Sequence, residues 1–74
     1  MESYLNKDAI FTILLSKVNY YGSGPLVVFG KITSIDNNFI SIEFDTNRKE
    51  NKFLKNTSGR MLVNKQFLTS IILL

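Results

Sequence analysis

The residues that could carry chemistry are few, and their types favour binding over catalysis. The chain has no histidine and no cysteine, which removes the commonest general base, the commonest thiol nucleophile and the soft ligands of zinc. Glu43 and Asp45 lie two residues apart and could hold a divalent cation, although solvated charges are the commoner outcome. Gly22-Ser23-Gly24 lacks the lysine and the helix of a phosphate-binding loop. We therefore expect that the protein is not an enzyme and binds no cofactor.

Positive charge is concentrated in one part of the chain. The 74 residues carry nine Lys or Arg and six Asp or Glu, a net charge of +3. Residues 48–65 hold six of the cations against Glu50 alone, a balance of +5, so the rest of the chain carries −2. A basic face is typical of proteins that bind polyanions, and equally of a solvated hairpin. The six cations are Arg48, Lys49, Lys52, Lys55, Arg60 and Lys65.

Phe39 is the aromatic residue that best fits base stacking. It follows the polar turn Asp36-Asn37-Asn38 and is out of phase with the apolar residues Ile40 and Ile42, so it points to the other, wetter face of its strand. Single-stranded nucleic acids are held by positive grooves with aromatic faces on which bases stack. The alternative is that a neighbouring subunit partly covers Phe39.

Five short strands are expected to position these residues. Period-two alternation is clearest after residue 39, and clusters of Gly, Pro, Asn and Ser mark the turns. Gly30, inside the second strand, indicates a bulge or a sharp bend of the kind that small barrels need. We also expect a short helix or a frayed start over 1–8, and a strand extension over 52–55. The expected strands cover 9–17, 26–35, 39–45, 60–63 and 67–74, with connections at 19–25, 36–38, 46–51, 56–59 and 64–66.

This order of elements predicts an all-β fold in a single domain over residues 1–74, an antiparallel barrel or sandwich. A domain of this size usually needs an additional source of stability. Because disulfides and zinc are excluded, the remaining sources are a well-packed core and self-association. The sequence finishes on Ile71-Ile72-Leu73-Leu74, an apolar strand that would promote aggregation if left exposed. We expect the barrel to close over this strand and another copy of the chain to pair with it.

The N-terminal residues do not look like a signal peptide, and no apolar run is long enough to span a membrane. The absence of cysteine fits a reducing compartment. We therefore expect a cytoplasmic protein with no membrane partner.

Two segments resemble the Sm-like family, which includes the Sm and LSm proteins and bacterial Hfq. Gly30-Lys31-Ile32-Thr33-Ser34-Ile35-Asp36, followed by Phe39-Ile40-Ser41-Ile42, is similar to the family's first motif, a bent strand, an aspartate turn and an apolar strand. Val63-Asn64-Lys65-Gln66-Phe67-Leu68-Thr69-Ser70-Ile71-Ile72 is similar, without gaps, to the Hfq form of the second motif. The resemblance implies a five-stranded, strongly bent antiparallel SH3-like barrel, the Sm fold.

The resemblance also implies an RNA pocket where the two segments meet. Phe39 matches the position that stacks a base, and Ser41 the position that reads the base edge. Lys65 matches the basic position, with Gln66 beside it, and Asp36 matches the aspartate that supports the pocket. The match requires one extra residue in the turn before Phe39, and serine has a shorter reach than the asparagine common at the base-reading position.

The function implied is a homo-oligomeric ring of about five to seven subunits that binds single-stranded, U- or A-rich RNA. In the family, the fourth strand of one subunit pairs with the fifth strand of the next, which here joins 60–63 to 68–73. A second hypothesis is a structural or protein-interaction ring with no RNA role, which the imperfect first motif favours. The interface residues expected from the pairing are Arg60, Met61, Leu62, Val63, Leu68, Ser70 and Ile72.

Overall fold

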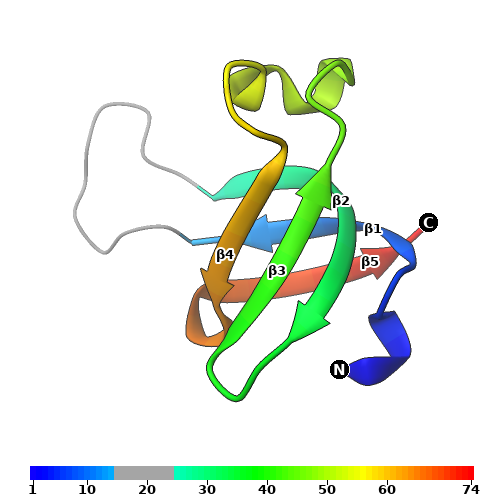
Figure 1. The fold of residues 1–74 in the computed structure, drawn as a ribbon, viewed down its shortest axis with the longest axis vertical. Helices are drawn as coiled ribbons and strands as arrows, with labels where there is room; N and C mark the ends of the chain where they lie inside the picture. The colour runs from blue at the N-terminus through cyan, green and yellow to red at the C-terminus, as the bar shows by residue number, and fades with distance from the viewer. Residues whose placement is uncertain (15–24) are drawn as a thin grey trace.

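The computed structural model describes residues 1–14 and 25–74, which form one antiparallel sheet of five strands in the order β4-β3-β2-β1-β5 (Figure 1). This confirms the predicted all-β, five-stranded fold. The expected strand end at 15–17 and nearly all of the expected loop at 19–25 lie outside the described residues. The elements are the 3₁₀ helix η1 (Glu2–Tyr4), β1 (Asp8–Ile13), β2 (Leu26–Ile35), β3 (Phe39–Phe44), the 3₁₀ helix η2 (Lys49–Leu54), β4 (Arg60–Asn64), the 3₁₀ helix η3 (Lys65–Phe67) and β5 (Leu68–Leu73).

Alternate residues of the strands build the core. In β3, Ile40 and Ile42 are at most 1% exposed, whereas Phe39, Ser41 and Glu43 lie on the other face. This confirms the alternation predicted for that strand, because successive side chains of a strand point to opposite faces. The buried apolar residues are Ala9, Phe11, Ile13, Val28, Ile32, Ile40, Ile42, Phe44 and Val63.

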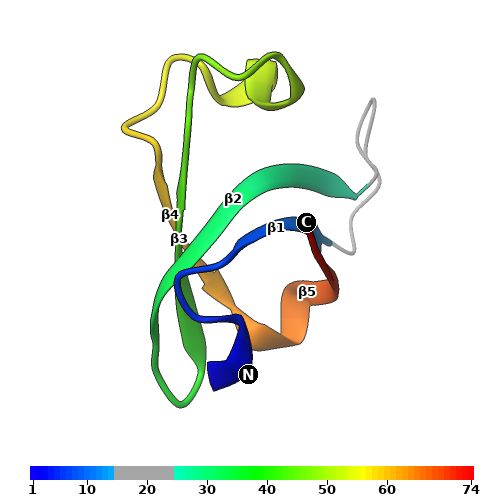
Figure 2. The ribbon, with the colours of Figure 1, turned by 90° about the vertical axis from the view of Figure 1, so that its right-hand side faces the viewer.

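β2 is the long strand that joins the two halves of the sheet. Its first half pairs with β1 and its second half with β3, and Figure 2 shows it curving from the layer of β1 and β5 to the layer of β3 and β4. Gly30 takes part in both ladders, and a Cβ there would lie 2.5 Å from the Glu43 carbonyl oxygen. The bend is therefore where the glycine predicted it, while the bulge lies at Thr33, where the register shifts between Ile32 and Ser34.

The sheet is open, so the expected closure of the barrel over the last strand is wrong. Among the described residues, β4 pairs with β3 alone and β5 pairs with β1 alone. The cause is the connection Lys65–Phe67, a single 3₁₀ turn after which β5 runs across β4 instead of alongside it (Figure 1). β5 accordingly has no fully buried residue, although Leu68 and Ile71 pack against the core.

The connection between β3 and β4 also differs from the prediction. Residues 52–55 are not a strand extension, because Lys49–Leu54 forms two 3₁₀ turns joined by a kink at Asn51. Asn51 is fully buried and Leu54 packs against the core, whereas Phe53 is 73% exposed. Residues three apart share a face of a 3₁₀ helix, so Asn51 and Leu54 face inward together. The apolar pair Phe53-Leu54 is therefore divided between solvent and core.

Of the two alternatives expected for residues 1–8, a short helix or a frayed start, the structure has the short helix, as one 3₁₀ turn. It docks on β2, where Leu5 forms a parallel bridge with Ile32 and the Asn6 N–H donates to the Ile32 carbonyl oxygen at 2.8 Å. Across residues 1–14 and 25–74, the helices are short 3₁₀ segments, and none has the length and apolar character needed to cross a membrane.

Candidate nucleic-acid interface

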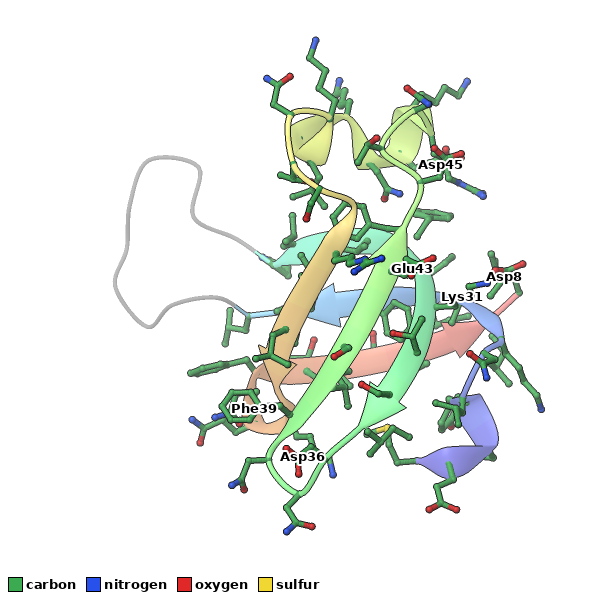
Figure 3. The ribbon with its side chains drawn as sticks, in the orientation of Figure 1. Asp8, Lys31, Asp36, Phe39, Glu43 and Asp45 are labelled. Atoms are coloured by element: carbon green, nitrogen blue, oxygen red, sulfur yellow. The ribbon has the colours of Figure 1, made fainter. Side chains whose placement is uncertain are left out.

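The β2–β3 turn and the β4–β5 connection meet at one end of the sheet. The Lys65 N–H donates to the Asn38 carbonyl oxygen at 2.8 Å, and Phe39 lies opposite Asn64 in the β3–β4 ladder. Figure 3 shows Asp36 and Phe39 at this end. Residues 36–39 and 64–67, which we call the Phe39 end, thus bring together most of the site residues predicted from two distant segments.

Asp36 holds the turn that presents Phe39. The Asp36 N–H donates to the Phe39 carbonyl oxygen at 2.8 Å, and its Oδ1 accepts the Asn37 N–H at 2.6 Å. An aspartate that bonds its own turn in this way favours a tight reversal of the chain. The start of β3, and with it the direction of the Phe39 side chain, is fixed by these bonds.

Phe39 and Ser41 share the outer face of β3 but line different hollows. Phe39, 37% exposed, lines an apolar hollow of about 360 Å³ at the free edge of β4. Ser41 lines a hollow of about 400 Å³ over β2, β3 and β4. Met61 and Leu62 line both hollows, and Leu62 lies opposite Ser41 in the ladder. The stacking and base-reading positions are thus neighbours along one strand rather than walls of one pocket.

Lys65 and Gln66 lie in η3, which confirms the tight connection predicted at 64–66. Asn64 caps this turn, since its Oδ1 accepts the Gln66 N–H at 3.1 Å. Lys65 is half-buried and Gln66 is exposed. Asn64 was not among the predicted site residues, although asparagine before a helical turn is a recognised capping signal.

The basic segment 48–65 divides its charge between the two ends of the sheet. Lys65 belongs to the Phe39 end, whereas the cations of η2 and its flanks follow the opposite end of β3, near Asp45 in Figure 3. The cations at this opposite end are Arg48, Lys49, Lys52 and Lys55. The Phe39 end therefore has less positive charge than the sequence suggested.

Both edges of the sheet carry main-chain groups that point away from it. The bonds from Lys65 N–H to Asn38 and from Phe44 N–H to Gly59 set the pattern of the β3–β4 ladder. In an antiparallel ladder, hydrogen-bonded pairs alternate with pairs that are not hydrogen-bonded. The N–H and C=O of Leu62 therefore point away from β3. On β5, the Leu74 N–H bonds the Asp8 carbonyl oxygen. By the same alternation, the N–H and C=O groups of Ile71 and Leu73 point away from β1.

The predicted interface residues lie on these two edges. Leu62 and Ile72 are 68% and 56% exposed, so each edge presents an apolar side chain as well as the outward-pointing main-chain groups. Val63, by contrast, is 6% exposed, and its side chain belongs to the core. The remaining predicted interface residues are Arg60, Met61, Leu68 and Ser70.

The acidic pair at the end of β3 does not form a cluster of ligands. The Asp45 carboxylate accepts the Asn47 N–H at 2.8 Å. In the part of the chain that the structure describes, no three acidic side chains gather where they could hold a metal ion. This region therefore offers no argument for metal chemistry.

Comparison with protein-family models, with curated proteins and with solved structures finds no match for this chain. Any functional assignment therefore rests on the residues and geometry described above.

Proposed function

We propose that the chain is an Sm-like protein that forms a homo-oligomeric ring and binds single-stranded RNA at the Phe39 end. The observation that carries the proposal is the 2.8 Å bond between Lys65 and Asn38, which joins the two turns. It brings a lysine to the strand end where an exposed aromatic ring begins β3. An aromatic face and a cation at the same end of the sheet suit a stacked base with its phosphate.

Each residue at this end has a role that its chemistry allows. Phe39 supplies the face on which a base stacks, and Lys65, repeated around a ring, supplies the charge for the phosphates. The Ser41 hydroxyl offers a base edge one oxygen atom, which both donates and accepts. Gln66 offers a donor and an acceptor on two separate atoms. Because phosphate contacts release counterions, binding of this kind weakens steeply as salt is raised.

The two open edges support self-assembly. Unpaired strand edges are templates for pairing with another chain, and here both are apolar as well as open. Pairing β4 of one copy with β5 of the next would satisfy both edges with a single repeated contact. A repeated head-to-tail contact gives a closed ring when its rotation closes.

The second candidate is a ring of the same kind that holds protein instead of RNA. The observation in its favour is the lining of the hollow beside Phe39, which is mostly apolar and suits an apolar side chain better than a polar base edge. The lining consists of Ile13, Phe39, Met61, Leu62, Val63, Asn64 and Phe67.

Size-exclusion chromatography with light scattering separates these candidates. We expect a mass of several chains, and a further increase when a short oligo(U) or oligo(A) is added. A monomeric mass would contradict ring formation. A ring whose mass and elution ignore both oligonucleotides would favour the protein-interaction candidate.

A further inference from the structure

Phe53 has the largest exposed fraction among the large apolar side chains of the described residues, at 73%. It lies in η2, beyond the end of β3 that is opposite the Phe39 end (Figure 3). The proposed RNA pocket does not use it, and the core does not need it. Its aromatic side chain is therefore available to a partner.

The segment that carries Phe53 is firmly seated. Asn51, fully buried, forms three hydrogen bonds of 2.9–3.0 Å with the main chain of Phe29 and Asp45. Arg48 lies over the Phe29 ring, 4.7 Å from its centroid, and bonds Glu50 at 3.1 Å. These contacts hold the main chain of η2 against β2 and the end of β3, and they leave the Phe53 side chain on the outside of the segment.

Three lysines flank Phe53 in the sequence at three-residue intervals. Lys49, Lys52 and Lys55 are all exposed. Within the described residues the single ion pair is Arg48–Glu50, so these lysines have no acidic partner there. Residues three apart share a face in a 3₁₀ helix, and the kink at Asn51 separates Lys49 from the other two. We call the exposed side chains of Lys49, Lys52, Phe53 and Lys55 the η2 surface.

We infer that the η2 surface is a second binding site for single-stranded nucleic acid, distinct from the Phe39 end. Phe53 stacks on one base, and Lys49, Lys52 and Lys55 contact the phosphates on either side of it. Stacking tolerates any base, because every base has a π face. This surface therefore adds affinity with little sequence preference, whatever the Phe39 end selects.

An anionic membrane is the other partner that lysines around an aromatic ring could fit. A single apolar anchor with a few cations gives only marginal membrane attachment. The residues around the η2 surface are polar, and Asn47, Asn56, Thr57 and Ser58 are all exposed. A stacked base needs only one ring, so nucleic acid fits this surface better.

The test separates this site from the Phe39 end by working in two backgrounds, the unchanged chain and Lys65→Glu. Fluorescence anisotropy measures the affinity for fluorescein-labelled oligo(U), oligo(A) and oligo(dT). In both backgrounds we expect Phe53→Ala and Phe53→Leu to weaken binding about tenfold, and Phe53→Trp to retain it. If Phe53→Ala leaves the affinity for the oligonucleotides unchanged in both backgrounds, the proposal is overturned. This holds whether or not Lys65→Glu itself weakens binding.

Charge and membrane controls complete the experiment. Lys52→Glu should weaken binding and reduce its salt dependence, whereas Lys7→Glu, the same charge change in the N-terminal segment, should alter neither by as much. Vesicles of phosphatidylcholine and phosphatidylglycerol test the membrane alternative. Binding to vesicles that survives Phe53→Leu, together with no effect of that change on oligonucleotides, would contradict a nucleic-acid site.

Discussion

The side-chain amide of Asn51 takes the place of a neighbouring strand for the main chain of Phe29. Its Oδ1 accepts the Phe29 N–H at 2.9 Å, and its Nδ2 donates to the Phe29 carbonyl oxygen at 2.9 Å. The β2–β3 ladder ends where Gly30 faces Phe44, so Phe29 lies one residue beyond it. A carboxamide has the same donor and acceptor as a peptide group, which is why asparagine can finish the ladder here.

Asn51→Ala should therefore destabilise the fold more than substitutions in a connection between strands usually do. It leaves the part-buried N–H and C=O of Phe29 without their partners. An unpaired group of this kind costs about 1–3 kcal/mol when it is buried. We expect the free energy of unfolding to fall by about 3 kcal/mol in urea titrations. Asn56→Ala, an exposed asparagine of the same connection, should change it by no more than about 0.5 kcal/mol. Equal effects of the two changes would contradict the role given to Asn51.

Lys65→Glu should remove RNA binding at the Phe39 end while leaving the assembly intact. The change puts a negative charge where phosphates are expected, but the main-chain bond from Lys65 to Asn38 does not depend on the side chain. Filter binding with oligo(U) should show at least a tenfold loss, and light scattering should show an unchanged mass. Phe39→Ala should give a similar loss. If Lys65→Glu binds oligo(U) as the unchanged chain does, the Phe39 end is not the RNA site.

Leu62→Pro tests the assembly through β4. The Leu62 N–H points away from β3, so proline removes a donor from the free edge without breaking the ladder inside the subunit. We expect light scattering to show monomers, with the β-sheet circular dichroism signal retained. Leu62→Ala removes the exposed side chain but keeps the N–H, and it should stay assembled. A proline variant that keeps the full mass would show that β4 is not the paired edge.

The strands that sequence alone predicted correctly are those with local signals. In β3, the alternation of Ile40 and Ile42 with Ser41 sets both the element and its buried face. The turn before it is marked by Asp36, whose side chain bonds the next residue. Signals of this kind involve neighbours a few residues apart, so they can be seen without the fold.

The features that sequence missed depend on distant partners. Asn51 bonds Phe29, 22 residues away, and nothing near Asn51 in the sequence indicates that it is buried. Phe53-Leu54 looks like a piece of strand until Asn51 fixes which of the two faces the core. The sheet is open because of the direction that β5 takes after Lys65–Phe67. The pattern of apolar and polar residues does not encode that direction.

Gly30→Ala separates two opposite expectations for a glycine inside a strand. At an ordinary strand position, glycine costs about 0.5–1 kcal/mol relative to alanine, so the change would stabilise the protein. Here the new Cβ would meet the Glu43 carbonyl oxygen at 2.5 Å and the Phe44 Cβ at 3.0 Å, so β3 would have to move. Overpacking of this kind costs about 1–3 kcal/mol, and we expect urea titration to show a loss of about 2 kcal/mol.

The control for Gly30→Ala is Ser34→Ala, an exposed position of the same strand where a Cβ is already present. It should change the free energy of unfolding by no more than about 0.5 kcal/mol. A stabilising effect of Gly30→Ala would mean that β2 and β3 do not approach as closely as the structure has them. The curvature of β2 would then need another cause, because Gly30 lies in both ladders at the point where the strand passes from one layer to the other (Figure 2).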